Sequence, residues 1–154
     1  MIPGLPRSQT PKLEIIKKIS EPAKPKINRF LKFIFHFSIL LLIIVSLFPG
    51  SLIGLLFFGD LGRQPNIVDN PFGTTINHFI SYFYVSMLGL CIYIREKNFE
   101  KLAYSLFFLS IILEIMHLII PNRAFQLYDL LANFLGVLVA YFLVKIYLTF
   151  KKND

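Results

Sequence analysis

Four long apolar runs constrain the fold of this sequence more than any other feature. They cover approximately residues 30–48, 76–94, 102–120 and 129–150. A helix that crosses the hydrocarbon core of a bilayer needs about 20 mostly apolar residues, and each run is close to that length. Hydrophobic residues form 55% of the 154 residues and charged residues only 16%, which is too little polar surface for a soluble domain. The sequence therefore predicts an all-α, multi-pass membrane protein with four transmembrane helices.

The distribution of positive charge predicts how these helices are oriented. Fourteen of the 16 Lys and Arg residues lie before or at the start of the first run, around the connection between the second and third runs, or near the C-terminus. The other two, Arg63 and Arg123, lie in the remaining connections. Basic residues concentrate on the cytoplasmic side of membrane proteins, so we expect both termini in the cytoplasm and the chain in the inner (plasma) membrane. The net charge of +7 comes with no nucleic-acid-binding motif, so we expect no nucleic-acid partner.

Two segments lie outside the apolar runs. Residues 1–29 contain five prolines and scattered lysines, a composition typical of a basic, disordered cytoplasmic tail, although one short amphipathic turn could rest on the membrane surface. Residues 30–150 then form the four-helix domain. The connection over 49–75 is rich in Gly and Pro, and its apolar start is too short to span the membrane. We expect that start to lie in the interface or to dip back into the bilayer, and the role of the connection stays open.

Polar residues from three helices are expected to meet at one depth, near the extracytoplasmic face. In this topology the second and fourth helices begin at that face and the third helix ends there. At a rise of about 1.5 Å per residue, Glu114 lies roughly 9 Å and His117 roughly 5 Å from the outer end of the third helix. Residues spaced i,i+3 or i,i+4 also share one face of a helix. The candidate ligand-binding residues are His78, Tyr82, Glu114, His117, Arg123, Asp129 and Asn133.

Several of these residues also have a purely structural interpretation. Asp129 could stabilise the start of the fourth helix through the helix dipole, Asn133 could join two helices, and Arg123 could reach lipid headgroups. Glu114 is the strongest functional candidate, because a carboxylate in hydrocarbon needs a partner or a proton. The two histidines and Arg123 are its available partners. An ion pair that locks the third helix to the fourth is the competing interpretation.

The pattern of these residues resembles the VanZ-like family of small polytopic membrane proteins, named for a protein linked to teicoplanin resistance. The family pattern runs approximately Asp-Lys-x-x-His-Phe-x-x-Tyr, then Glu-x-x-Gln, Pro-x-Arg and Asp-x-x-x-Asn-x-x-Gly. The chain departs from it where Thr74 and Thr75 replace Asp-Lys and where His117 replaces Gln. The resemblance implies a four-helix protein of the cell envelope, with lowered sensitivity to lipoglycopeptide antibiotics as the associated phenotype. The matching residues, over roughly 74–140, are His78, Phe79, Tyr82, Glu114, Pro121, Arg123, Asp129, Asn133 and Gly136.

The leading functional hypothesis is the binding or remodelling of a membrane lipid or a lipid-linked cell-wall precursor. Arg123 would clamp an anionic group through a bidentate contact. Glu114, Asp129 and Asn133 would orient Arg123 and complete the pocket, and the 49–75 connection would cover it. Association with further copies of the chain in a homo-oligomer also stays open.

Two other functions stay open. An intramembrane enzyme could act on a lipid-linked substrate with Glu114 as general acid or base. The catalytic residues of such an enzyme are unknown, since no serine has an evident activating partner. A proton- or ion-coupled transporter is also conceivable, although four helices are few for a transport pathway. We expect no cofactor, and no metal site because the Glu, His and Asp residues are scattered along the chain.

Overall fold

The computed structural model describes residues 26–67 and 71–153, and most of the expected cytoplasmic tail over 1–29 lies outside that part. The regular structure of the described residues is entirely helical, which confirms the all-α prediction. The helices are α2 (Lys26–Leu47), α3 (Leu52–Phe58), α4 (Thr75–Ile92), α5 (Phe99–Met116) and α6 (Leu127–Asn153).

Three of these helices, α2, α4 and α6, are long and apolar enough to cross a membrane. Helix α5 has 18 residues, but it carries the charged residues Glu100, Lys101 and Glu114. The outer faces of the helices are strongly apolar: the exposed fractions of Phe33 and Phe108 are 67% and 68%. Large exposed apolar side chains of this kind fit a lipid environment and not an aqueous one.

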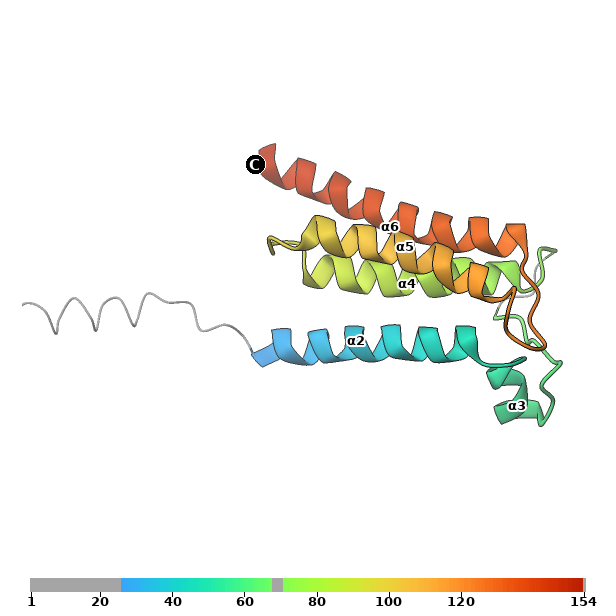
Figure 1. Cartoon of the computed structure of the whole chain (residues 1–154). Helices are drawn as coiled ribbons and strands as arrows, with labels where there is room; N and C mark the ends of the chain where they lie inside the picture. Colours follow the sequence, from blue (N-terminus) through green and yellow to red (C-terminus); the bar gives the residue numbers. More distant parts are fainter. Residues whose placement is uncertain (1–25, 68–70, 154) are drawn as a thin grey trace, which may run out of the picture.

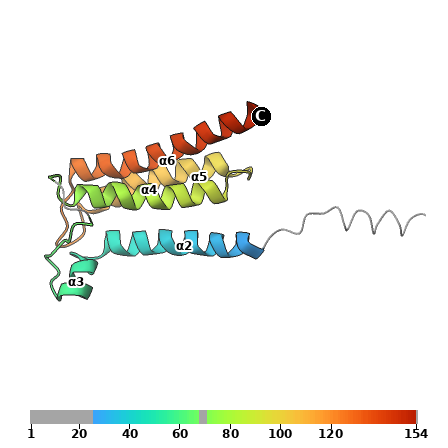
Figure 2. The same cartoon turned by 180° about the vertical axis from the view of Figure 1, so that it is seen from behind.

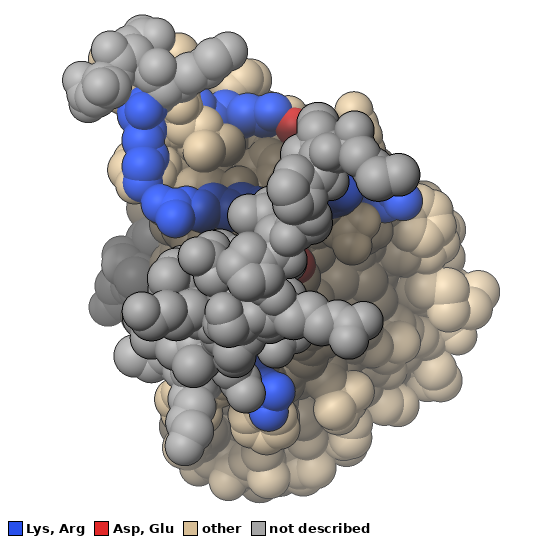
Figure 3. Space-filling model, turned by 90° about the vertical axis from the view of Figure 1, so that its left-hand side faces the viewer, with Lys and Arg blue, Asp and Glu red and all other residues tan. Residues whose placement is uncertain are grey.

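The four long helices run along one another in alternating directions (Figures 1 and 2). Helices α2 and α5 run one way, and α4 and α6 return, so that α2 begins and α6 finishes at the same end of the bundle. We call this the basic end, because Lys and Arg side chains gather over it (Figure 3). The opposite end, the α3 end, holds α3, the starts of α4 and α6, and the last turn of α5. The exposed basic residues of the elements at the basic end are Arg29, Arg95, Lys97, Lys101 and Lys151.

Helices α4 and α6 approach closely because small residues line the face of α6 that packs inward. Gly136 leaves no room for a side chain: a Cβ there would lie 2.6 Å from the backbone oxygen of Phe79 and 2.9 Å from the backbone nitrogen of Phe83. Ala132 and Ala140 are buried on the same face. Small residues at every fourth position allow such close helix approach, and glycine allows it most.

Helix α2 is held to α4 by a similar contact toward the basic end of the bundle. A Cβ on Gly89 would lie 2.3 Å from the ring of Phe35, a side chain only 2% exposed. The Phe35 ring also packs edge-on against Tyr93, with 5.9 Å between ring centroids. One aromatic side chain therefore anchors α2 to the second half of α4.

Replacing Gly136 with alanine should destabilise the bundle. The added methyl group meets backbone atoms of α4, which cannot rotate away, so the helices must separate, and we expect a loss of about 1–3 kcal/mol in the free energy of unfolding. Thermal unfolding in detergent, followed by circular dichroism, measures it. Gly62→Ala is the matched control, since its Cβ would meet Asp60 Oδ1 at an ordinary 3.4 Å. Equal stability of the two variants would contradict the close contact.

The structure corrects the predicted end of the third helix. The sequence predicted 102–120, whereas α5 ends at Met116, and the other helix ends differ from the predictions by one to four residues. Beyond Met116 the α-helix gives way to tighter turns, in which the amides of His117, Leu118 and Ile119 each donate a hydrogen bond to the carbonyl three residues earlier. Pro121 then follows, which has no N–H to donate. Glu114 consequently lies in the last turn of the helix and not two turns inside it.

Candidate functional site

The carboxylate of Glu114 is the centre of a buried polar network at the α3 end. Its side chain has no exposed surface. Oε1 accepts a hydrogen bond from the backbone N–H of Gln126 (3.2 Å) and lies 3.2 Å from Nδ1 of His117. Oε2 accepts a hydrogen bond from Nδ2 of Asn133 at 3.2 Å. A buried carboxylate is tolerated when several donors surround it, and Glu114 meets donors from its own helix, the following loop and α6.

His117 connects this carboxylate to α2. Its Nε2 lies 3.0 Å from the backbone oxygen of Ser46. A carbonyl oxygen can only accept a hydrogen bond, so Nε2 carries a proton and donates the hydrogen bond. The other ring nitrogen faces Glu114 Oε1. That contact is a hydrogen bond only if one proton is shared between the ring and the carboxylate. The pair is therefore neutral overall, which suits a site shielded from water.

His78 extends the network toward the start of α4. Its Nδ1 lies 3.1 Å from Oδ1 of Asn133, whose amide already donates to Glu114. Its Nε2 lies 3.5 Å from Oδ2 of Asp129, and Asp129 Oδ1 accepts a 2.6 Å hydrogen bond from the hydroxyl of Thr75. The polar contacts thus run without a break from α4 through α6 and α5 to α2, and they tie the four long helices together at this end.

Arg123 does not pair with Glu114 and instead caps the C-terminal end of α2. Its Nε donates to the backbone oxygen of Phe48 (3.1 Å) and its Nη2 to that of Val45 (2.7 Å). The last carbonyls of a helix carry partial negative charge and lack partners, so a guanidinium fits there. Burial lowers the pKa of Arg123 from its ordinary value and the Glu114 carboxylate opposes that shift. The group stays positively charged, because an arginine in a protein is not deprotonated.

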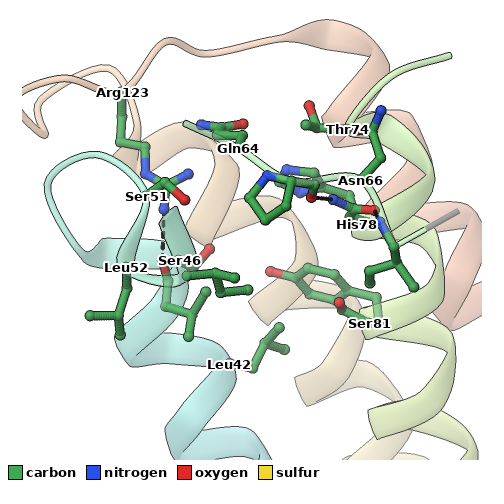
Figure 4. Close-up of a pocket in the computed structure, with 16 residues that line it drawn as sticks. Leu42, Ser46, Ser51, Leu52, Gln64, Asn66, Thr74, His78, Ser81 and Arg123 are labelled. Carbon is green, nitrogen blue, oxygen red and sulfur yellow. Dashed lines mark hydrogen bonds between the residues drawn. The ribbon is translucent and has the colours of Figure 1, made fainter. Parts of the chain in front are cut away.

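A pocket of about 200 Å³, the α2–α4 pocket, lies beside Arg123. Figure 4 shows Arg123 reaching in from its loop, with Leu42 and Ser46 of α2 on one side and His78 and Ser81 of α4 on the other. Arg123 and His78 are the basic residues among the described residues that line it, and none of those lining residues is acidic. The pocket therefore presents one permanent positive charge and a set of neutral polar groups.

Tyr82 also lines this pocket, and its hydroxyl makes no hydrogen bond within the described part of the chain. The side chain is only 3% exposed. The Ser46 side chain lies near this hydroxyl but outside hydrogen-bonding geometry. Leaving a buried hydroxyl without a partner costs about 1–3 kcal/mol. This hydroxyl can therefore donate a hydrogen bond to an acceptor on a bound ligand.

Asn77, which the sequence analysis did not select, holds the loop over the pocket. Its Nδ2 donates to the backbone oxygen of Pro65 and its Oδ1 accepts from the amide of Ile67, each at 2.8 Å. Thr75 was likewise missed as a partner of Asp129. Both were detectable in principle: Thr75 lies one turn before His78 on the same face of α4, and a polar residue at the first turn of a helix often serves a nearby loop.

The seven candidate residues divide into two groups. His78, Tyr82 and Arg123 line the α2–α4 pocket. The remaining four lie behind His78 in the buried network, and the geometry does not favour Glu114 as a general acid or base, because it has no exposed surface and does not line the pocket. Within the described residues, no three His, Cys, Asp or Glu side chains form a group that could hold a metal ion. The four network residues are Glu114, His117, Asp129 and Asn133.

The comparison with protein families matches the chain over most of its length. A model of the family described as VanZ/LLP1 matches residues 10–148. No curated protein and no solved structure matches the chain.

Proposed function

This chain belongs to the VanZ/LLP1 family, and we propose that it is a multi-pass protein of the inner (plasma) membrane that binds an anionic group of a lipid or lipid-linked cell-wall component. The ligand site is the α2–α4 pocket. Binding at this site would occupy or remodel an envelope component, and lowered sensitivity to lipoglycopeptides such as teicoplanin would follow from that occupation.

The observation that carries the proposal is the charge of the pocket. A guanidinium has five N–H donors, and only two of those of Arg123 form hydrogen bonds with backbone oxygens at the end of α2. The other donors remain for a ligand, and the described lining residues include no carboxylate that would compete for them. A partly buried guanidinium beside neutral hydrogen-bonding groups is a recognised arrangement for binding carboxylate or phosphate oxygens.

The buried network supports this site from behind. His78 lines the pocket on one side and contacts Asn133 and Asp129 on the other. Its ring is therefore held in one orientation by α6, and Glu114 fixes Asn133 in turn. A binding residue whose position is fixed by a second layer of hydrogen bonds loses less conformational entropy when the ligand arrives. The network thus serves the pocket by positioning it.

The proposal includes four membrane crossings, with the basic end in the cytoplasm. Cysteine labelling tests the crossing of α5, with Cys91 replaced by serine to remove background. Lys97→Cys, before α5, should react with a membrane-impermeant maleimide only after the cells are permeabilised. Ala124→Cys, after α5, should react in intact cells, since both positions are exposed. Labelling of both positions from the same side would show that α5 does not cross.

A stability measurement tests the function itself. Protein stripped of lipid in detergent should unfold at a higher temperature when a lipid extract of the envelope is added, because a ligand that binds the folded state stabilises it. The same extract passed over an anion exchanger, which removes its anionic components, should give no such increase. In a sensitive host, the teicoplanin phenotype should be lost with Arg123→Ala. Equal stabilisation by both extracts would exclude an anionic ligand.

A further inference from the structure

We infer that the ligand of the α2–α4 pocket is the phosphate-bearing headgroup of a membrane lipid whose chains lie along α2 and α3. The inference rests on the proposed function and makes it specific: the anion comes from the bilayer and not from solution.

The two sides of the pocket differ in polarity, as an amphiphilic ligand requires. Leu42 and Val45 of α2, with Leu52 and Ile53 of α3, form a mostly apolar side, which also carries Ser46 and has Arg123 at the end of α2. Figure 4 shows Leu42 and Leu52 on the side opposite His78 and Ser81. A small soluble anion gains nothing from an apolar wall, because its charge is better solvated by water. A lipid gains from both sides at once, since its phosphate meets the polar groups while the first carbons of its chains contact the apolar wall.

The size of the pocket limits how much of the lipid enters. A cavity of about 150 Å³ admits a benzene molecule, so the 200 Å³ of this pocket corresponds to roughly eight non-hydrogen atoms. That is enough for a phosphate diester and the carbons on either side of it. A complete sugar–peptide headgroup of a cell-wall precursor is several times too large, so the acyl chains and any bulky headgroup remain outside.

Helix α3 places the pocket at the depth where lipid phosphates lie. It contributes Leu52 and Ile53 to the pocket, while Leu56 and Phe57 on the same short helix are 71% and 77% exposed. A helix that presents large apolar side chains at the end of a membrane bundle lies in the interface between headgroups and acyl chains. A ligand already in that layer reaches Arg123 without leaving the membrane.

The hydroxyl of Tyr82 completes the recognition of a phosphate. A phosphate diester offers more acceptor positions than one guanidinium can fill. Tyr82 supplies a buried donor that has no partner within the described residues, and it lines the same pocket as Arg123. A phosphate oxygen that reaches the base of the pocket satisfies this hydroxyl, so Tyr82 contributes affinity while contributing no hydrogen bond to the fold.

Native mass spectrometry of lipid-stripped protein in detergent tests the inference with three probes. These are phosphatidylglycerol, diacylglycerol with the same chains, which lacks the phosphate, and glycerol phosphate, which carries the anion without the chains. We expect one phosphatidylglycerol per chain, weaker binding of diacylglycerol, and no displacement by excess glycerol phosphate. Tyr82→Phe should weaken phosphatidylglycerol binding about tenfold, the value of one hydrogen bond to a charged group, with no loss of thermal stability.

A second variant isolates the apolar side. Ile53→Gln, at a side chain 42% exposed, should weaken the binding of phosphatidylglycerol and leave that of glycerol phosphate unchanged. If glycerol phosphate binds as well as the lipid, the chains contribute nothing to binding: the inference fails, while the proposed binding of an anionic group stands. If diacylglycerol binds as well as phosphatidylglycerol, or if Tyr82→Phe binds like the wild type, the inference is also wrong. If none of the probes binds, the inference fails, and the measurement with the lipid extract decides whether the proposed function fails with it.

Discussion

Replacing Glu114 with glutamine should lower the free energy of unfolding by about 2–4 kcal/mol, the largest stability loss we expect from one substitution of similar size. The carboxylate oxygens contact three donors, on Gln126, Asn133 and His117. An amide has one acceptor oxygen, and its NH₂ group would face donors, so at least one of them loses its acceptor. The proton shared with His117 also loses one of its two sites. Denaturation in detergent, followed by circular dichroism, measures the change.

Glu100→Gln is the matched control, on the same helix at the basic end. Glu100 pairs with Lys145 and accepts a hydrogen bond from Tyr141, but 47% of its side chain is exposed. Solvent screens such a pair, so its loss should cost less than about 1 kcal/mol. If the two variants are equally stable, the network around Glu114 does not hold the helices together, and its residues need another explanation.

Replacing Arg123 with alanine should reduce affinity for the anionic ligand about a hundredfold or more. Removal of a charged, bidentate contact costs about 3 kcal/mol or more, and each 1.4 kcal/mol is about a factor of ten. Arg123→Lys keeps the charge but not the planar fork, so it should recover part of the affinity. Titration with phosphatidylglycerol, followed by native mass spectrometry, measures the three proteins side by side.

Arg123 also bonds to the end of α2, so its removal is expected to loosen that helix as well as the ligand. Tyr82→Phe separates the two effects, because it takes one donor from the pocket and no hydrogen bond from the described structure. Weaker binding in Tyr82→Phe at unchanged stability assigns the loss to the pocket. Wild-type affinity in folded Arg123→Ala would remove Arg123 from the site.

The features that repeat with helical spacing could be predicted from the sequence. The four apolar runs correspond to α2, α4, α5 and α6, because apolar residues over about 20 positions favour a buried or membrane helix whatever their order. The inward face of α6 was also predictable: Asp129, Asn133 and Gly136 are spaced by three and four residues, and all three are buried. Such spacing places residues on one side of a helix irrespective of the rest of the fold.

The partners of the charged groups could not be predicted in the same way. Arg123 was an expected partner of the Glu114 carboxylate, yet it binds main-chain oxygens of Val45 and Phe48. Every residue carries such an oxygen, so no residue type signals which of them is left free at a helix end. The early end of α5 after Met116 was missed for a related reason: an apolar sequence continues to Ile120, and the tight turns depend on backbone contacts.

An anionic lipid held at Arg123 in the α2–α4 pocket is the central element of the proposed function. Native mass spectrometry of protein purified directly from its membrane, without added ligand, tests this most directly. Wild-type protein should carry the mass of one anionic lipid, Tyr82→Phe should retain less of it, and folded Arg123→Ala should carry none. The same lipid mass on all three proteins, or no lipid on the wild type, would contradict the account and leave the polar cluster as a lock between helices.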